Sequence, residues 1–123
     1  FDAMQLLWEP ISRVAVLQGG PGAGQQTKLT NQILVASSMI GVSEALLFAR
    51  TAGLNVDQVL QSVSSGAASS WALVNLGPRM LVHDFAPGFY VEHFVKDLGI
   101  ALEECHRMGL RLRGLDVAFQ CYR

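Results

Sequence analysis

Residues Gly20–Gln32 read GPGAGQQTKLTNQ, a glycine-rich loop that leads into a helix. Glycines give the backbone access to positive φ, and only one glycine interrupts the following run Gln25–Ala52, which therefore predicts a long helix. Lys28 falls in its first turn or so, and Asn31 and Gln32 follow three and four residues later. The three polar side chains share one helix face, so they can converge on one small polar molecule.

Two better-known glycine motifs do not fit this loop. Gly19 and Gly24 have the outer spacing of a phosphate-binding P-loop, but Gln25 and Gln26 stand where that loop needs Lys and Ser or Thr. The dinucleotide-binding fingerprint fails as well, because Thr27 occupies the position of its third glycine. The loop therefore matches neither kind of nucleotide site.

The stretch resembles instead the lysine motif of the β-hydroxyacid dehydrogenases, the family of 3-hydroxyisobutyrate and tartronate semialdehyde dehydrogenases or reductases. In that family Gly-x-Gly-x-x-x-Lys-x-x-Asn carries the catalytic lysine, and many members have a second asparagine where this chain has Gln32. The likeness covers roughly residues 18 to 122. It continues through Ser43-Glu44-Ala45, Ala52-Gly53-Leu54, Gly66 to Trp71, Asp84-Phe85-x-Pro87-Gly88-Phe89 and Lys96-Asp97-Leu98.

The resemblance implies a mainly α fold, the helical C-terminal domain of the 6-phosphogluconate dehydrogenase-like type with one long helix. Residues 20–123 would form this domain, cut short at its C-terminus, and residues 1–19 would be the last helix and strand of a missing Rossmann domain. The chain begins with Phe1 rather than methionine, which agrees with a fragment. As a full-length protein it would be an NAD(P)-dependent dehydrogenase of a small 3-hydroxy acid, whereas the fragment alone is expected to be inactive.

The resemblance also implies a role for each site residue. Lys28 would be the general acid and base, exchanging a proton with the substrate hydroxyl while a hydride moves to or from the nicotinamide. A partly buried lysine near a helix N-terminus suits this task, because the helix dipole and desolvation disfavour its charged form. Asn31 and Gln32 would bind the substrate. Lys96 would reach the cofactor near its nicotinamide end, with Asp97 orienting it.

The remaining implications concern partners and location. NAD or NADP would be bound mainly by the missing N-terminal domain, and the protein would form a homodimer or homotetramer. It would be cytoplasmic, or lie in the mitochondrial matrix if the source is eukaryotic. From the residues alone, Lys28 and Lys96 are compatible with ordinary solvated lysines, so a noncatalytic dimerisation or interaction module that kept the fold is the alternative. Retention of Lys28, Asn31 and Lys96 together favours the enzyme.

Composition limits the class independently. The chain has 123 residues, 50% of them apolar, which fits one globular domain. A net charge of −1 with 15% charged residues argues against a nucleic-acid partner or a basic membrane patch. No apolar run is expected to approach the roughly 20 residues of a membrane span. Cys105 and Cys121 are expected to be buried reduced thiols, and the histidines show no metal-ligand spacing.

Capping residues and periodicity predict the other elements. The aromatic group Trp71, Phe89, Tyr90 and Phe94 is interpreted as core, with a substrate-lining role as the alternative. Before the long helix, the predicted segments are a helix Phe1–Trp8 and a strand Arg13–Gln18. After it come a helix opening at Asn55 or Val56-Asp57, a loop with an N-cap at Ser69 or Ser70, a helix Trp71–Leu76 ended by Gly77-Pro78, and a further turn Arg79–Val82. The last predicted segments are a loop His83–Gly88, a helix from Val91 or Glu92 to about Met108, a loop Arg111–Gly114 and a helix Leu115–Tyr122.

Overall fold

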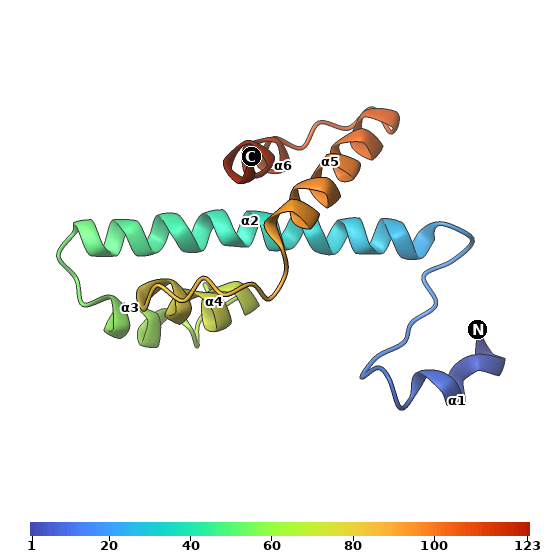
Figure 1. Ribbon diagram of the computed structural model, residues 1–123, viewed down its shortest axis with the longest axis horizontal. Coiled ribbons are helices and arrows are strands. Elements are labelled where there is room, and N and C mark those ends of the chain that lie inside the picture. Colours follow the sequence, from blue (N-terminus) through green and yellow to red (C-terminus); the bar gives the residue numbers. More distant parts are fainter.

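The computed structural model describes residues 1–123 and confirms a mainly α fold, without any strand (Figure 1). Its one long helix, α2, begins two residues before the predicted start, after Gly22 in a left-handed conformation at φ 92°. The elements are the 3-10 helix η1 Asp2–Met4 and the α-helices α1 Gln5–Trp8, α2 Ala23–Thr51, α3 Val56–Val63, α4 Trp71–Leu81, α5 Val91–Arg107 and α6 Arg113–Tyr122.

Helix α2 is the axis of the fold. Its 29 residues span about 43 Å at 1.5 Å per residue. Helices α3 and α4 pack along one side of it, and α5 and α6 pack on the opposite side (Figure 1). No other helix-to-helix contact joins these two pairs, so α2 and the loop between α4 and α5 connect them.

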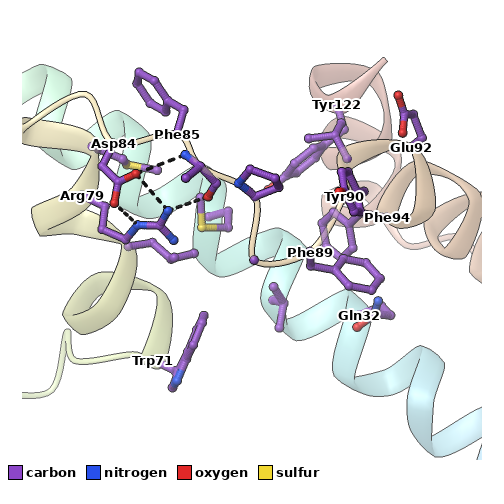
Figure 2. A pocket seen from close by; sticks show the side chains of 18 of the residues that line it. Gln32, Trp71, Arg79, Asp84, Phe85, Phe89, Tyr90, Glu92, Phe94 and Tyr122 are labelled. Carbon is purple, nitrogen blue, oxygen red and sulfur yellow. Dashed lines mark hydrogen bonds and ion pairs between the residues drawn. The ribbon is translucent and has the colours of Figure 1, made fainter.

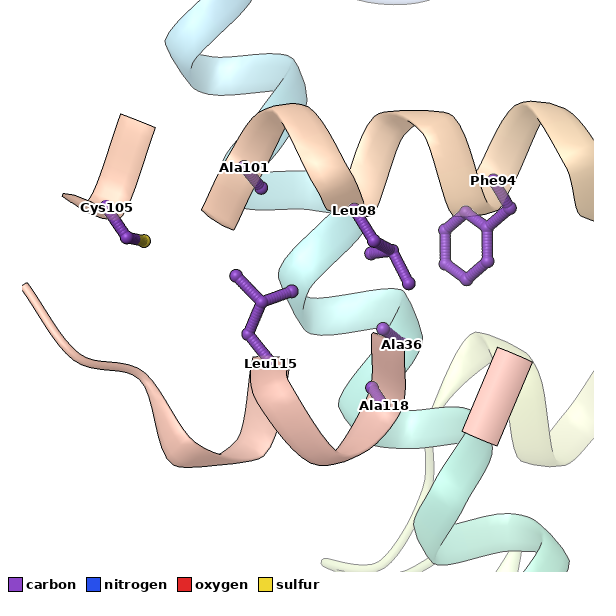
Figure 3. Close-up of a cluster of buried hydrophobic side chains, with 7 residues drawn as sticks. All are labelled: Ala36, Phe94, Leu98, Ala101, Cys105, Leu115 and Ala118. Carbon is purple, nitrogen blue, oxygen red and sulfur yellow. The ribbon is translucent and has the colours of Figure 1, made fainter. Parts of the chain in front are cut away.

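Each helix pair encloses its own hydrophobic cluster against α2. The α5–α6 cluster, drawn in Figure 3, consists of Ala36, Phe94, Leu98, Ala101, Cys105, Leu115 and Ala118. The α3–α4 cluster consists of Val42, Leu46, Leu60, Ala72 and Leu73.

Two helices begin at the predicted side-chain caps. The Asn55 carboxamide oxygen accepts from the Gln58 amide at 3.1 Å, which starts α3. The Ser70 hydroxyl accepts from the Leu73 amide at 3.0 Å, which starts α4. Such caps satisfy amides that have no partner inside the helix, and each contributes about 1 kcal/mol. The segment before α4 is thus a loop with a cap, as predicted.

Three helices end in the same left-handed geometry. Gly53 and Gly109 follow α2 and α5 with φ of 74° and 68°, and His83 follows α4 with φ 55°. In each case the next amide donates to the carbonyl five residues earlier, at 3.0, 2.8 and 2.9 Å respectively. This is the Schellman arrangement, which normally favours glycine. His83 adopts it at a steric cost.

The predicted stop at Gly77-Pro78 is wrong, because α4 continues through Pro78 to Leu81. A proline inside a helix costs about 3 kcal/mol. Met80 and Leu81, which follow the proline, pack against the α3–α4 cluster, and this burial offsets the cost. Gly77 itself lies against α3, where an added Cβ would meet Leu60 Cδ2 at 3.2 Å.

The N-terminal segment behaves differently from the prediction. The helix expected over residues 1–8 is present as η1 and α1, but the expected strand over residues 13–18 is not formed. A strand is held by hydrogen bonds to a neighbouring strand, and residues 1–123 contain none. Val14, Val16 and Leu17 are 76, 61 and 62% exposed, and α1 contacts no helix except η1. The domain boundary at residue 19 stays a prediction.

Two expectations from composition need correction. Helix α2 is long and apolar enough, by length and composition alone, to cross a membrane. A mostly buried core helix of a soluble protein passes the same test; in α2 the apolar 18-residue window is 28% buried, under the four helices that pack on it. Neither cysteine is in a disulfide, as expected, but only Cys105 is buried. Cys121 is exposed because it lies on the side of α6 that faces away from the cluster.

Candidate functional site

A pocket of about 930 Å³ lies between the two sides of the bundle (Figure 2). Lys28 and Gln32 of α2 contribute to one wall, and Arg79 of α4 and the loop after it contribute to the other. Most of the lining is apolar, which is typical of small-molecule sites. The aromatic lining residues are Trp71, Phe85, Phe89, Tyr90, Phe94 and Tyr122.

Lys28 presents its ammonium group to this pocket. The Nζ atom donates a hydrogen bond to Gln32 Oε1 at 2.8 Å and lies 5.8 Å from the centroid of the Phe89 ring. The first contact is a charge-assisted hydrogen bond, and the second is a cation–π contact with the face of the ring. The spacing of four residues along α2 produces the first contact, as the helix periodicity predicted.

Gln32 is the buried centre of the site, with only 3% of its surface exposed. Its Oε1 accepts from Lys28 Nζ and also from Asn31 Nδ2, the latter at 3.0 Å. Its Nε2 donates to Asp97 Oδ2 of α5 at 2.8 Å. The three α2 side chains therefore meet one another at the Gln32 amide, and their convergence on a bound molecule stays a prediction. Asn31 is exposed and lies outside the pocket lining.

Asp97 and Lys96 extend this set of contacts along α5. Lys96 Nζ lies 2.9 Å from Asp97 Oδ1, and the two side chains are 65 and 15% exposed. The hydrogen bond from Lys96 is the main reason that the pKa of Asp97 is lowered, and the hydrogen bond from Gln32 and the charges of Lys96 and Lys28 act in the same direction while desolvation opposes them. Lys28, Gln32, Asp97 and Lys96 thus form one continuous polar chain between α2 and α5.

Arg79 and Asp84 form a second polar group, to which the sequence analysis gave no role. Arg79 Nε and Nη2 donate to the Asp84 carboxylate at 2.8 and 3.2 Å, and Nη2 also donates to the Ala86 carbonyl. The Ala86 amide donates back to Asp84 Oδ1 at 3.1 Å (Figure 2). The pKa of Asp84 is lowered, first by the bond from Arg79 and then by that amide. These contacts fix the loop that forms one wall of the pocket.

The interpretation of the aromatic group as core is wrong for three of its four members. Phe94 is buried, but Phe89, Tyr90 and Trp71 are 55, 59 and 67% exposed and line the pocket. Trp71 is the first residue of α4, and Phe89 and Tyr90 belong to the loop before α5, so none of them faces a helix cluster. Phe94 joins core and pocket through edge-to-face contact with Phe89, at a centroid distance of 6.2 Å.

Comparison with known proteins relates this architecture to dehydrogenases. Residues 22–123 match the family described as NAD-binding of NADP-dependent 3-hydroxyisobutyrate dehydrogenase. An uncharacterised oxidoreductase of Bacillus subtilis is 48% identical over 99% of this chain and 42% of its own length. A probable mitochondrial 3-hydroxyisobutyrate dehydrogenase-like protein of Arabidopsis thaliana is 55% identical over 85% of this chain and 31% of its own.

A solved structure shows the same fold. The crystal structure of 3-hydroxyisobutyrate dehydrogenase from Salmonella typhimurium superposes with a TM-score of 0.89 and 26% identity, over 99% of this chain and 43% of that protein. The chain therefore spans less than half the length of each protein that it matches here.

Proposed function

We propose a function from one premise: the chain belongs to the family described as NAD-binding of NADP-dependent 3-hydroxyisobutyrate dehydrogenase. It is the helical part of an NAD(P)-dependent oxidoreductase that acts on a small 3-hydroxy acid, with Lys28 as the general acid and base. The position of the Lys28 ammonium at the pocket, bonded to a buried neutral amide, is the observation that carries this proposal.

The charges around the pocket support the role of Lys28. Arg79, the other cation of the lining, is paired with Asp84 in two hydrogen bonds. Lys28 instead bonds to Gln32, which leaves its charge available to a substrate carboxylate or to the proton of a hydroxyl. Aromatic walls and one available cation suit a flat nicotinamide ring beside a small hydroxy acid. When bound, the nicotinamide supplies the hydride chemistry.

The chain's own residues handle the proton and the substrate. In oxidation Lys28, when neutral, takes the hydroxyl proton, and in reduction it returns the proton as an ammonium. Asn31 uses its Nδ2 for Gln32 and keeps its Oδ1 for a ligand. Lys96 contributes to the cofactor end of the site through its exposed ammonium, with Asp97 holding it.

We extend the proposal to the cofactor and the assembly. NAD or NADP is held mainly by residues outside this chain, because the chain lacks a dinucleotide-binding glycine fingerprint. The protein is a homodimer or homotetramer. In support, α2 exposes Leu34, Leu47 and Phe48 by 65, 66 and 73%, a surface suited to burial against a second subunit.

The experiment that tests this function uses the full-length protein with 3-hydroxyisobutyrate and NAD⁺ or NADP⁺. We expect K28A to lower kcat by about two orders of magnitude or more, the usual size of lost acid-base help, while the cofactor Kd stays nearly unchanged. K96A is the matched control, because it removes the other lysine of the chain. It should weaken the cofactor complex as well as the rate. Near-normal turnover of K28A would refute the assigned role.

A further inference from the structure

We infer that Gln32 is a positioning residue that sets the orientation and protonation of Lys28 by linking it to the Asp97–Lys96 pair on α5. The inference rests on the proposed function of Lys28 and deepens it. Its starting point is burial: Gln32 is the one polar side chain among the buried residues of the chain. A buried amide is tolerated only when its hydrogen-bonding groups are satisfied, and this one has three partners.

The partners permit a single orientation of the amide. A lysine ammonium can only donate, so the atom that faces Lys28 must be the carbonyl oxygen. An ionised carboxylate can only accept, so the atom that faces Asp97 must be the nitrogen. Rotating the amide by half a turn would place donor against donor on one side and acceptor against acceptor on the other. The two charges therefore hold Gln32, and Gln32 in turn holds Lys28.

The length of the side chain matters equally. Gln32 reaches Lys28 one turn earlier on its own helix and Asp97 on the neighbouring helix, both at 2.8 Å. Asparagine, which many family members have at this position, is one methylene shorter, so on the backbone of this chain it cannot keep both the 2.8 Å contact to Lys28 and the 2.8 Å contact to Asp97. Lys28 has no other hydrogen-bond partner in the chain, and its remaining contact is the Phe89 ring. A shorter side chain at position 32 would therefore leave the Lys28 ammonium without a fixed orientation.

The hydrogen bond from Gln32 to Asp97 also polarises the amide of Gln32. An amide that donates to a carboxylate becomes a better acceptor at its oxygen, because bonds in a chain polarise one another. The negative charge of Asp97 thus strengthens the hydrogen bond between Gln32 Oε1 and the Lys28 ammonium, while the Lys96 ammonium, 2.9 Å from Asp97 Oδ1, weakens this effect. The other ionisable groups at the pocket are Glu92 of α5, Tyr90 of the loop, Tyr122 of α6, and Arg79 and Asp84, which are paired with each other.

The test compares two substitutions at one position. Q32N keeps the amide and loses the reach, whereas Q32E keeps the reach and places a carboxylate beside Lys28. The control is Q26N: Gln26 of α2 donates to Glu104 of α5 at 3.0 Å, the same kind of contact between the same two helices on an exposed surface. Each full-length variant is labelled with acetic anhydride over a pH range, and mass spectrometry gives the pH midpoint of Lys28 labelling. The pH profile of kcat is measured in parallel.

The two substitutions should act in opposite directions. Q32N should lower the labelling midpoint and reduce kcat at least tenfold with less than a twofold change in cofactor KM. Q32E should raise the midpoint, because the new carboxylate would share one proton with Asp97 and still leave a negative charge beside Lys28, and the alkaline rise of the oxidation rate should move with it. Q26N should change neither readout. A purely structural defect would not shift the midpoint in opposite directions.

Several results overturn or sustain the inference separately from the proposed function. Unchanged midpoints in both variants, or shifts of the same sign, would overturn it. If Q32N fails to fold, the direction of the Q32E shift decides. If the wild-type protein oxidises no 3-hydroxy acid but the opposite shifts are found, the proposed function fails and the link between Gln32 and Lys28 stands.

Discussion

Replacing Leu98 by alanine tests how tightly the α5–α6 cluster, drawn in Figure 3, is packed. Leu98 is 0% exposed and is one of the two largest fully buried side chains of the chain. It projects from α5 toward Ala36 of α2 and Ala118 of α6, which are also 0% exposed. Asp97 precedes it on the same helix, so the packing of Leu98 also supports the position of the polar chain.

The cost of L98A can be worked from these neighbours. Leucine-to-alanine changes in cores cost about 2–5 kcal/mol, and the value is higher where the surroundings cannot move into the cavity. Ala36 and Ala118 end at Cβ and cannot reach farther into the space. We therefore expect about 3–4 kcal/mol, which for a chain of this size corresponds to a drop in Tm of roughly 12–16 °C.

Circular dichroism during urea and thermal unfolding measures this difference. I100A is the matched control, because it removes the same number of carbon atoms from the same helix at a position that is 41% exposed. It should cost less than about 1.5 kcal/mol. A cost below about 1 kcal/mol for L98A, or equal costs for the two variants, would show that the cluster is loosely packed and would refute the reasoning.

Two further predictions concern single residues. His83 has φ 55°, a conformation that costs a non-glycine residue about 1–2 kcal/mol. Glycine relieves this strain but has more freedom in the unfolded chain, so H83G should raise the free energy of unfolding by up to about 1 kcal/mol. H83V should lower the free energy of unfolding, because a β-branched residue fits this conformation poorly. The pKa of Asp97 is lowered in the folded state, so its contribution to stability is present above the unfolded value of about 4 and is lost as the pH falls below it. D97N should flatten the decrease of Tm between about pH 5 and pH 2, and an unchanged slope would contradict the assigned contacts.

Local signals explain which parts of the fold could be predicted. Asn55, Ser70, Gly53 and Gly109 act within a few residues of their own position, so the sequence shows both the residue and the backbone that it caps. The family motif drew attention to Lys28 in the same way, because a lysine and its partner four residues later share a helix face whatever the rest of the chain does.

The errors arose where distant residues decide the outcome. Pro78 stays in a helix because residues beyond it pack on α3 and α2, which no local rule describes. Whether Phe89 faces a core or a pocket depends on how its loop is held by Arg79. The contact of Gln32 with Asp97 of α5 was not predicted, because the two residues lie 65 positions apart in the sequence. The proposed contact of Gln32 with substrate stays a prediction.

The connection of the two helix pairs through α2 and a single loop has a consequence for the energetics of local opening. We expect each cluster with its half of α2 to open as a separate cooperative unit, so that amide hydrogen exchange in one unit does not require opening of the other. The pocket is lined by residues from both units. A ligand that binds only when both are closed raises the free energy of opening each of them by RT ln(1 + [L]/Kd), including amides that lie far from the ligand. Occupancy of the pocket would thus merge two independently exchanging halves into one.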